Sequence, residues 1–264
     1  MSTFTPIDQA LAAFAAGQIV IVVDNENREN EGDFIMLAEK ATPEKVAFIN
    51  RYSTGILCAP MNRKRAMDLG LPLMWAKNQD TNKTAFTVTT DAKKNLTTGV
   101  SATERATTFT ELARATATPS DFVRPGHVFP LIAADGLLEE RQGHTEAAIA
   151  MATLVGAQPV GLLCEIVNED GSMSRLPDLE KFAEKHGLPL ITIEALADYA
   201  RSKNLAAFTA VVPELVWANL PIDGANWRIA SFTNSAGIDH AIVALGDVSG
   251  GAEVVMRVHS ECLT

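Results

Sequence analysis

The segment from Asp24 to Asp33 reads D-N-E-N-R-E-N-E-G-D and gathers acidic side chains between two apolar runs. Its acidic residues are Asp24, Glu26, Glu29, Glu31 and Asp33. If the segment is extended, Glu29, Glu31 and Asp33 point to one side, because strand side chains alternate with a period of two. Three carboxylates on one face are typical of a site for Mg²⁺, which prefers oxygen ligands. The alternative is a solvated acidic loop, since runs of charge usually lie on the surface.

A histidine stands in a second unusual stretch, Arg124-Pro125-Gly126-His127-Val128-Phe129-Pro130. Two prolines and a glycine restrict the backbone, which predicts that a stiff loop, and not a helix or a strand interior, presents His127. A lone histidine is most often structural, so this stretch by itself favours a structural role over a functional one.

A third stretch, Arg141-Gln142-Gly143-His144-Thr145-Glu146, precedes an apolar helical run from Ala147 to Val155. The free N–H groups at the start of that helix would meet the Arg141 guanidinium and the Thr145 hydroxyl. This combination suits a phosphate or a metal-bound oxyanion. The alternative, a plain helix cap beside a surface arginine, fits the local sequence equally well.

Glu165 interrupts the apolar run from Val160 to Val167. That run is typical of a buried strand, where an ionised carboxylate is costly unless it is paired, bound to a metal or protonated. A functional role is therefore favoured for Glu165.

The whole chain limits the classes of function. Its 264 residues carry a formal net charge of −10, which argues against a nucleic-acid groove. No apolar run approaches the roughly 20 residues that cross a bilayer, and the first residues lack the pattern of a signal peptide. We expect a cytoplasmic protein with no membrane partner. The cysteines, Cys58, Cys164 and Cys262, are too few and too far apart for a disulfide frame or a complete thiolate metal site.

Alternating elements are expected to position these residues. Helices are predicted at 5–16 with Thr5 as the cap, and at 42–51, 102–113, 147–155, 177–186 and 194–201. Strands are predicted at 19–23, 34–38, 55–60, 85–90, 160–167 and 190–193. Arg63, Lys64 and Arg65 form a compact basic run that we interpret as a solvated helix face. The alternation predicts a compact α/β (α+β) domain, in which helices surround a mixed sheet.

The pattern changes beyond a linker at 204–208. Strands are predicted at 227–232, 240–245 and 254–258, with a turn cluster at 246–251. We therefore divide the chain into a domain at 1–203, the linker, and a partial β-rich segment at 209–264.

Taken together, these motifs resemble the 3,4-dihydroxy-2-butanone 4-phosphate synthases of riboflavin biosynthesis from about residue 5 to residue 201. The matching pieces are residues 28–33 (RENEGD), 97–102 (TTGVSA), 124–130 (RPGHVFP), 143–147 (GHTEA) and 163–165 (LCE). The segment from about 209 resembles the opening strands of GTP cyclohydrolase II. Its residues 259–264 (HSECLT) are similar to the motif that holds the first zinc cysteine of that family.

The resemblance implies a compact homodimeric α/β enzyme that converts D-ribulose 5-phosphate to L-3,4-dihydroxy-2-butanone 4-phosphate and formate. It implies Mg²⁺ as the cofactor, with Mn²⁺ as an alternative, and Glu29 and His144 as its ligands. His127 and Glu165 are implied as the proton-transfer groups, with Glu31 beside the metal. The implied substrate-binding residues are Arg28, Glu29, Asp33, Arg141, Gln142, Gly143, His144, Thr145 and Glu165. Cys58 matches a cysteine common near this site, although packing explains it equally well.

Some positions depart from the family pattern, namely Asn25, Asn27, Ile132 and Gln142. The alternative function is a non-catalytic homologue that binds metal and sugar phosphate in a regulatory or assembly role. Retention of Glu29, His127, His144 and Glu165 favours the enzyme. A complete GTP cyclohydrolase II activity is not expected from these residues, because that family needs two further zinc cysteines after Cys262.

Overall fold

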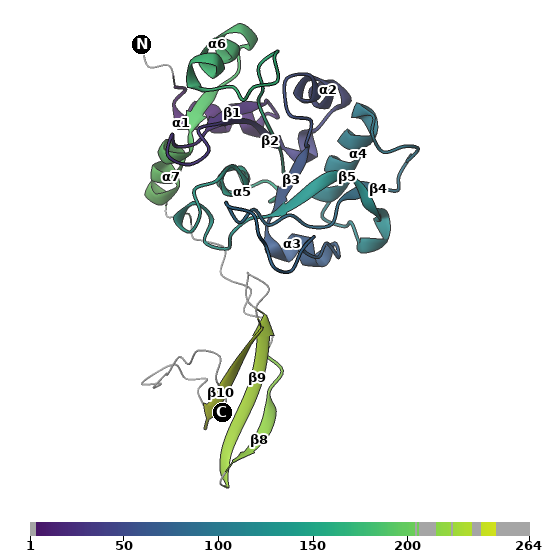
Figure 1. Cartoon of the computed structure of the whole chain (residues 1–264), viewed down its shortest axis with the longest axis vertical. Coiled ribbons are helices and arrows are strands. Elements are labelled where there is room, and N and C mark those ends of the chain that lie inside the picture. The colour runs from purple at the N-terminus through teal and green to yellow at the C-terminus, as the bar shows by residue number, and fades with distance from the viewer. Residues whose placement is uncertain (1–3, 204, 206–214, 223, 234–238, 247–264) are drawn as a thin grey trace. The chain divides into compact units, whose positions relative to one another are not determined.

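The computed structural model describes residues 4–203, 205, 215–222, 224–233 and 239–246 (Figure 1). Contacts divide the chain into two units, Met1–Val211 and Val212–Thr264. The predicted linker at 204–208 lies almost entirely outside the described residues. Within the described ranges, no helix has both the length and the apolar character needed to cross a membrane.

The first unit is built on a seven-stranded mixed sheet with the order β4-β5-β3-β6-β2-β1-β7. The strands are β1 Val20–Val23, β2 Gly32–Leu37, β3 Cys58–Met61, β4 Thr90–Ala92, β5 Phe122–Ile132, β6 Gly161–Glu165 and β7 Leu190–Thr192. The β1–β7 and β3–β5 pairs are parallel, and the other neighbouring pairs are antiparallel. The predicted mixed α/β class is therefore confirmed.

Helices cover both faces of this sheet. They are α1 Ile7–Ala15, α2 Pro43–Arg51, α3 Arg63–Asp68, α4 Ala102–Ala113, α5 His144–Leu154, α6 Leu176–His186 and α7 Ile193–Ser202. Ile21 and Phe34 point into a core shared with α2, α4 and α6, whereas Val22 and Ile35 point into a second core with α1, α5 and α7. Burial on both faces explains why the central strands are continuous apolar runs.

Local sequence signals fix several helix ends. The Thr42 hydroxyl accepts a hydrogen bond from the Lys45 backbone at the start of α2. Ser101 and Glu104 form a capping box at the start of α4, whose bounds match the prediction. Gly187 ends α6 in a left-handed conformation that costs glycine little.

Three local expectations are wrong. At the first helix, α1 begins at Ile7 after Pro6, and the Thr5 hydroxyl accepts from the Leu190 backbone instead of capping the helix. In the basic run, Arg65 is buried and donates to the Leu112 carbonyl oxygen, so this side chain is not solvated. Of the strand predicted at 85–90, only Thr90 lies in a strand, β4, and Phe86 and Thr87 form isolated bridges.

The second unit contains a three-stranded antiparallel sheet with the order β10-β9-β8. The strands are β8 Ala218–Ile222, β9 Ala225–Thr233 and β10 Asp239–Leu245. Those predicted at 227–232 and 240–245 are confirmed. The strand predicted at 254–258, most of the turn cluster at 246–251 and Cys262 lie outside the described residues.

Candidate metal and substrate site

The acidic segment turns before Gly32 and Asp33 enter β2, so the condition for placing Glu29, Glu31 and Asp33 on one strand face is not met. Residues 26–29 turn between β1 and β2, and Asn30 has a φ of 55°. The Asp24 carboxylate accepts hydrogen bonds from the backbone N–H groups of Glu29 (3.1 Å) and Glu31 (2.9 Å). Arg175 Nη1 donates to the carbonyl oxygens of Glu29 (2.8 Å) and Asn30. These hydrogen bonds therefore fix the position of the Glu29 backbone.

Arg28 reduces the repulsion inside this turn. Its Nη1 lies 2.9 Å from Asp24 Oδ2 and 2.5 Å from Glu29 Oε2. Opposite charges at such distances attract strongly when they are partly shielded from water. One cation thus holds two carboxylates of the segment close together.

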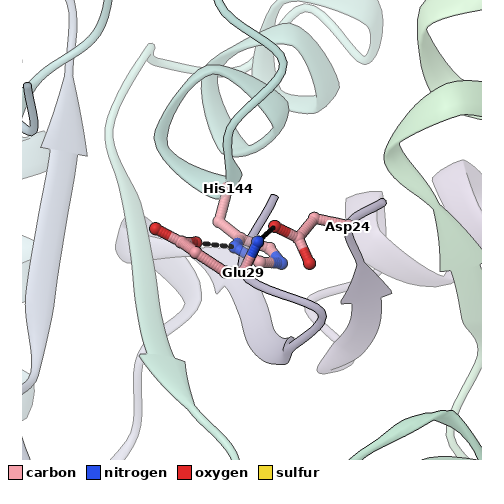
Figure 2. A group of neighbouring side chains, drawn as sticks. All are labelled: Asp24, Glu29 and His144. Carbon is pink, nitrogen blue, oxygen red and sulfur yellow. Dashed lines mark hydrogen bonds and ion pairs between the residues drawn. The ribbon is translucent and has the colours of Figure 1, made fainter. Parts of the chain in front are cut away.

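His144 is the first residue of α5 and points toward the acidic turn (Figure 2). Its Nε2 lies 3.1 Å from the Val22 carbonyl oxygen, which can only accept a hydrogen bond. Nε2 therefore carries a proton, and Nδ1 faces Glu29 Oε2 at 3.7 Å and Asp33 Oδ1 at 3.6 Å. A histidine whose far nitrogen is held by a carbonyl is typical of a metal ligand.

Burial and neighbouring charges change the pKa values of these groups. Burial raises the pKa of Asp33 to about 8. Burial would lower the pKa of His144, but the carboxylates of Asp33, Glu29 and Asp24 outweigh it and raise that pKa to about 9. For Glu29, His144 and Arg28 outweigh burial and lower the pKa to about 2.

The donor atoms fit a divalent cation. Asp24, Glu29 and His144 each offer one ligand atom, and these atoms lie within 4.8 Å of one another. Asp33 Oδ1 is buried and has no hydrogen-bond partner. A buried oxygen without a partner is costly unless something positive binds near it. Carboxylate oxygens and one imidazole nitrogen suit Mg²⁺ or Mn²⁺.

Arg141 lies beside this group and is linked to it through Asn82. Arg141 Nη1 lies 2.5 Å from Glu146 Oε2, and Arg141 Nε donates to the Asn82 carbonyl oxygen at 3.2 Å. The Asn82 side-chain amide in turn donates to Glu29 Oε1 at 2.6 Å. Sequence reasoning missed Asn82, because the segment around it shows no periodic pattern or motif.

The other predicted substrate-binding residues of this stretch, Gln142, Gly143 and Thr145, lie at the start of α5 or just before it. The helix begins at His144, three residues before the predicted start, and Gly143 occupies its N-terminal cap without a side-chain hydrogen bond. A Cβ on Gly143 would overlap Arg141 Nη1, so a side chain there would displace the guanidinium from its present position. Thr145 is buried in the first turn, and Gln142 is exposed.

Glu165 ends β6 directly opposite Asp33 in the β2–β6 ladder. It is half-buried, and its Oε2 accepts a hydrogen bond from the Thr54 hydroxyl at 2.6 Å. The structure thus brings Glu165 next to the acidic group that contains Glu29, Asp33 and His144.

His127 lies within strand β5, so the predicted stiff loop is wrong. Its ring Nδ1 lies 2.7 Å from Asp91 Oδ2. Within the described part of the chain, no hydrogen bond or ion pair joins His127 to Glu29, His144 or Glu165. The predicted residues therefore form two groups that are not in direct contact within one chain.

Cys58 is buried in β3, close enough to Glu165 and Asp33 for their charges to act on its thiol. Burial raises the pKa of its thiol well above the ordinary value. The neutral thiol donates to the Ile56 carbonyl oxygen at 3.4 Å, as expected for a residue with a packing role.

Comparisons with known proteins agree on one family. Residues 8–199 match the family model described as 3,4-dihydroxy-2-butanone 4-phosphate synthase. The riboflavin biosynthesis protein RibBA of Salinispora arenicola is 47% identical over 266 residues, which cover 100% of this chain and 62% of that protein. RibBA of Mycobacterium tuberculosis is 44% identical over 271 residues, covering 100% of this chain and 63% of that protein. The chain thus spans less than two thirds of the length of these relatives.

Comparison with a solved structure indicates the same family. It is described as 3,4-dihydroxy-2-butanone 4-phosphate synthase in complex with two magnesium ions, and it is similar to this chain with a TM-score of 0.73 and 40% identity. The match covers 76% of this chain and 99% of that chain.

Proposed function

Because the chain belongs to the 3,4-dihydroxy-2-butanone 4-phosphate synthase family, we propose that it is a lyase of riboflavin biosynthesis. Its substrate is D-ribulose 5-phosphate, and its products are L-3,4-dihydroxy-2-butanone 4-phosphate and formate. The observation that carries this proposal is the group formed by His144 Nδ1, the Glu29 carboxylate and the buried Asp33 oxygen that has no hydrogen-bond partner.

Glu29 and His144 are the proposed ligands of the cofactor, Mg²⁺, for which Mn²⁺ can substitute. When bound there, the cation would stabilise the negative charge that develops on a substrate oxygen next to the carbonyl. We assign Asp24 to the organisation of the turn, because it already accepts from Arg28 and from two backbone N–H groups. Asn82, which donates to Glu29, adds a polar group at the edge of the site.

Different residues are proposed to bind the sugar and the phosphate. Arg28 and Asp33 contact the hydroxyl groups of the sugar. Residues 141–145 bind the phosphate, for which the uncapped start of α5 and the remaining guanidinium N–H groups of Arg141 offer donors.

Proton transfer is assigned to Glu165 and His127. Removing a proton next to a carbonyl requires a base within hydrogen-bond reach, and the proton must later return to carbon. Glu165 lies opposite Asp33 in the sheet and so faces the proposed sugar position. His127 presents a half-exposed ring that can accept and release a proton.

The family resemblance further supports a homodimer in the cytoplasm. The match to RibBA proteins along the whole chain supports residues 209–264 as the beginning of a GTP cyclohydrolase II segment.

Formate release from ribulose 5-phosphate tests the function. Wild-type protein with Mg²⁺ should release formate, whereas excess chelator or the His144→Ala substitution should abolish it. His186→Ala is the control, because His186 packs among the aromatic rings of Phe48, Tyr52 and Phe182, away from the acidic turn. Absence of formate from a wild-type sample that still binds the substrate would instead indicate a non-catalytic homologue.

A further inference from the structure

The buried carboxylate of Asp91 has no role in the function proposed above. Asp91 lies in β4 and is only 2% exposed. Both of its oxygens contact one residue of the neighbouring strand: Oδ1 accepts from the His127 backbone N–H at 2.8 Å, and Oδ2 lies 2.7 Å from His127 Nδ1. The His127 side chain beyond this contact is 46% exposed.

We propose that Asp91 is a positioning residue, which holds His127 with a proton on Nδ1 and leaves the Nε2 lone pair free for substrate. This inference rests on the proposed function, in which His127 transfers a proton. Nε2 would take a proton from the substrate, giving an imidazolium, and would later return that proton to the substrate. The adjacent Asp91 carboxylate stabilises the positive charge in the interval.

The two contacts of Asp91 determine both the orientation and the protonation of the ring. An ionised carboxylate can only accept hydrogen bonds, so the nitrogen that faces it must donate. Since Oδ1 is fixed by the backbone of the same histidine, the carboxylate cannot rotate freely away from Nδ1. The ring is thereby held in one tautomer and one direction.

Two glycines allow this close packing. A Cβ on Gly126 would overlap backbone atoms of Thr90 and Asp91, so glycine is needed for β5 to approach β4 next to His127. Gly99, with a φ of +77°, lies over the pair: its Cβ would overlap Asp91 Oδ2 and lie 2.8 Å from His127 Nδ1. Glycines at both positions therefore leave room for the carboxylate–imidazole pair.

Glu104 holds the loop that carries Gly99. Its Oε1 accepts from the backbone N–H groups of Thr97 (2.6 Å) and Gly99 (3.1 Å), and its Oε2 accepts from the Ser101 hydroxyl (2.8 Å). The loop is thus fixed above Asp91 and His127 from the first turn of α4.

Asp91→Asn in the full-length protein tests the inference with two measurements. An asparagine can turn its amide toward Nδ1, which would place the imidazole proton on Nε2. We expect ¹⁵N NMR of the histidine rings to report this change of tautomer, with the His127 signal assigned from His127→Gln. We expect kcat for formate release to fall about 100-fold, with KM within about twofold. Asp91→Glu should restore the wild-type tautomer and part of kcat.

The matched control is Asp121→Asn. Asp121 directly precedes β5 and pairs with Arg114 at the surface, so the same change of charge there should leave the tautomer of His127 and kcat unchanged.

A second pair of variants avoids any change of charge. Gly99→Ala places a methyl group against the Asp91–His127 pair and should lower kcat about tenfold or more. Gly171→Ala carries a similar backbone penalty at a φ of +83°, but its Cβ would meet nothing within 4 Å, so kcat should stay at the wild-type value. If Asp91→Asn fails to fold, the comparison of Gly99→Ala with Gly171→Ala still tests whether Asp91 positions His127.

Results that contradict the role of Asp91 can be distinguished from results that contradict the role of His127. An unchanged tautomer or a kcat within twofold of wild type in Asp91→Asn would overturn this inference, provided that His127→Gln is inactive. Equal kcat values in Gly99→Ala and Gly171→Ala would also overturn it. A wild-type kcat in His127→Gln would overturn the proposed role of His127 itself, together with the positioning role that depends on it.

Discussion

Three ionisable side chains set the chemistry of the site at the scale of single residues. The pKa of Asp33 is raised to about 8 by burial, and that of His144 is raised to about 9 because nearby carboxylates outweigh burial. Glu29 stays ionised, with a pKa of about 2. At neutral pH, Asp33 and His144 of the metal-free protein are therefore protonated at the place where the cation would bind.

Cation binding should release protons, because a protonated imidazole cannot act as a ligand. A pKa raised to about 9 means that His144 is protonated below that pH, so the affinity for Mg²⁺ should rise as pH increases from 7 to 9. Isothermal titration with Mn²⁺ or Mg²⁺ at pH 7, in buffers of different ionisation enthalpy, should show release of at least one proton per cation. The number of protons released should fall toward zero above pH 9. Binding without proton release at pH 7 would contradict this account of His144.

Glu165 is expected to act in turnover and not in binding. Glu165→Gln keeps the shape of the side chain and the contact with Thr54, but it removes the basic carboxylate. We expect kcat to fall about 100-fold or more, with the substrate Kd within about threefold. Glu169→Gln, on the exposed turn that follows, is the control. Near-normal activity of Glu165→Gln would remove Glu165 from the mechanism.

Residues that lie in short motifs could be recognised from the sequence. Glu29, His144 and Glu165 were all selected, and the structure brings them to one place. Asp91 and Asn82 were not selected. Each acts through a contact with a residue far away in the sequence, His127 and Glu29 respectively, and neither stands in a recognisable motif.

Arg175 links two elements, since it ties the start of α6 to the acidic turn. It donates to the carbonyl oxygens of Glu29 and Asn30 and so fixes the backbone that carries the proposed ligand. Arg175→Ala should weaken Mg²⁺ binding about tenfold, as is common when a group that orients a metal ligand is removed. Titration calorimetry would measure the change.

Arg201→Ala serves as the control for Arg175→Ala. Arg201 of α7 also forms ion pairs, with Asp198 of the same helix and with Glu139, and neither partner belongs to the acidic turn. Equal Mg²⁺ affinities in both variants and the wild type would show that Arg175 does not orient Glu29.

The prediction of elements failed where contacts between distant segments override local patterns. His127 was expected in a loop because of the prolines around it, yet it lies within β5, whose residues on either side of it pair with β4 and β3. The shared face of Glu29, Glu31 and Asp33 depended on an extended segment, but the Asp24 carboxylate accepts from the backbone of Glu29 and Glu31, and the segment turns. By contrast, α4 was predicted with its correct bounds, because its capping box and helical pattern are local.

At the scale of the whole molecule, the described site residues all belong to the first unit, Met1–Val211. The α/β class was predictable because apolar strands alternate with capped helices. The strand order was not, since it depends on pairings such as β1 with β7 that no local pattern encodes.

A protein consisting of residues 1–203 should retain the activity. It contains the complete seven-stranded sheet and all the proposed catalytic, metal and substrate residues. We expect its kcat for formate release to be within about twofold of the full chain, and its thermal unfolding to be a single cooperative transition. A folded but inactive 1–203 protein would show that residues beyond 203 contribute to the site.

We propose that the Glu29–His144 site supports the loss of one carbon from ribulose 5-phosphate. The most direct test uses substrate labelled with ¹³C at the fourth carbon and follows the products by NMR, with Mg²⁺ and with excess chelator. Labelled formate should appear only with Mg²⁺, and Glu29→Gln and His144→Ala should produce none. Labelled carbon that stays in a five-carbon product, or formate that forms equally well in chelator, would contradict this proposal.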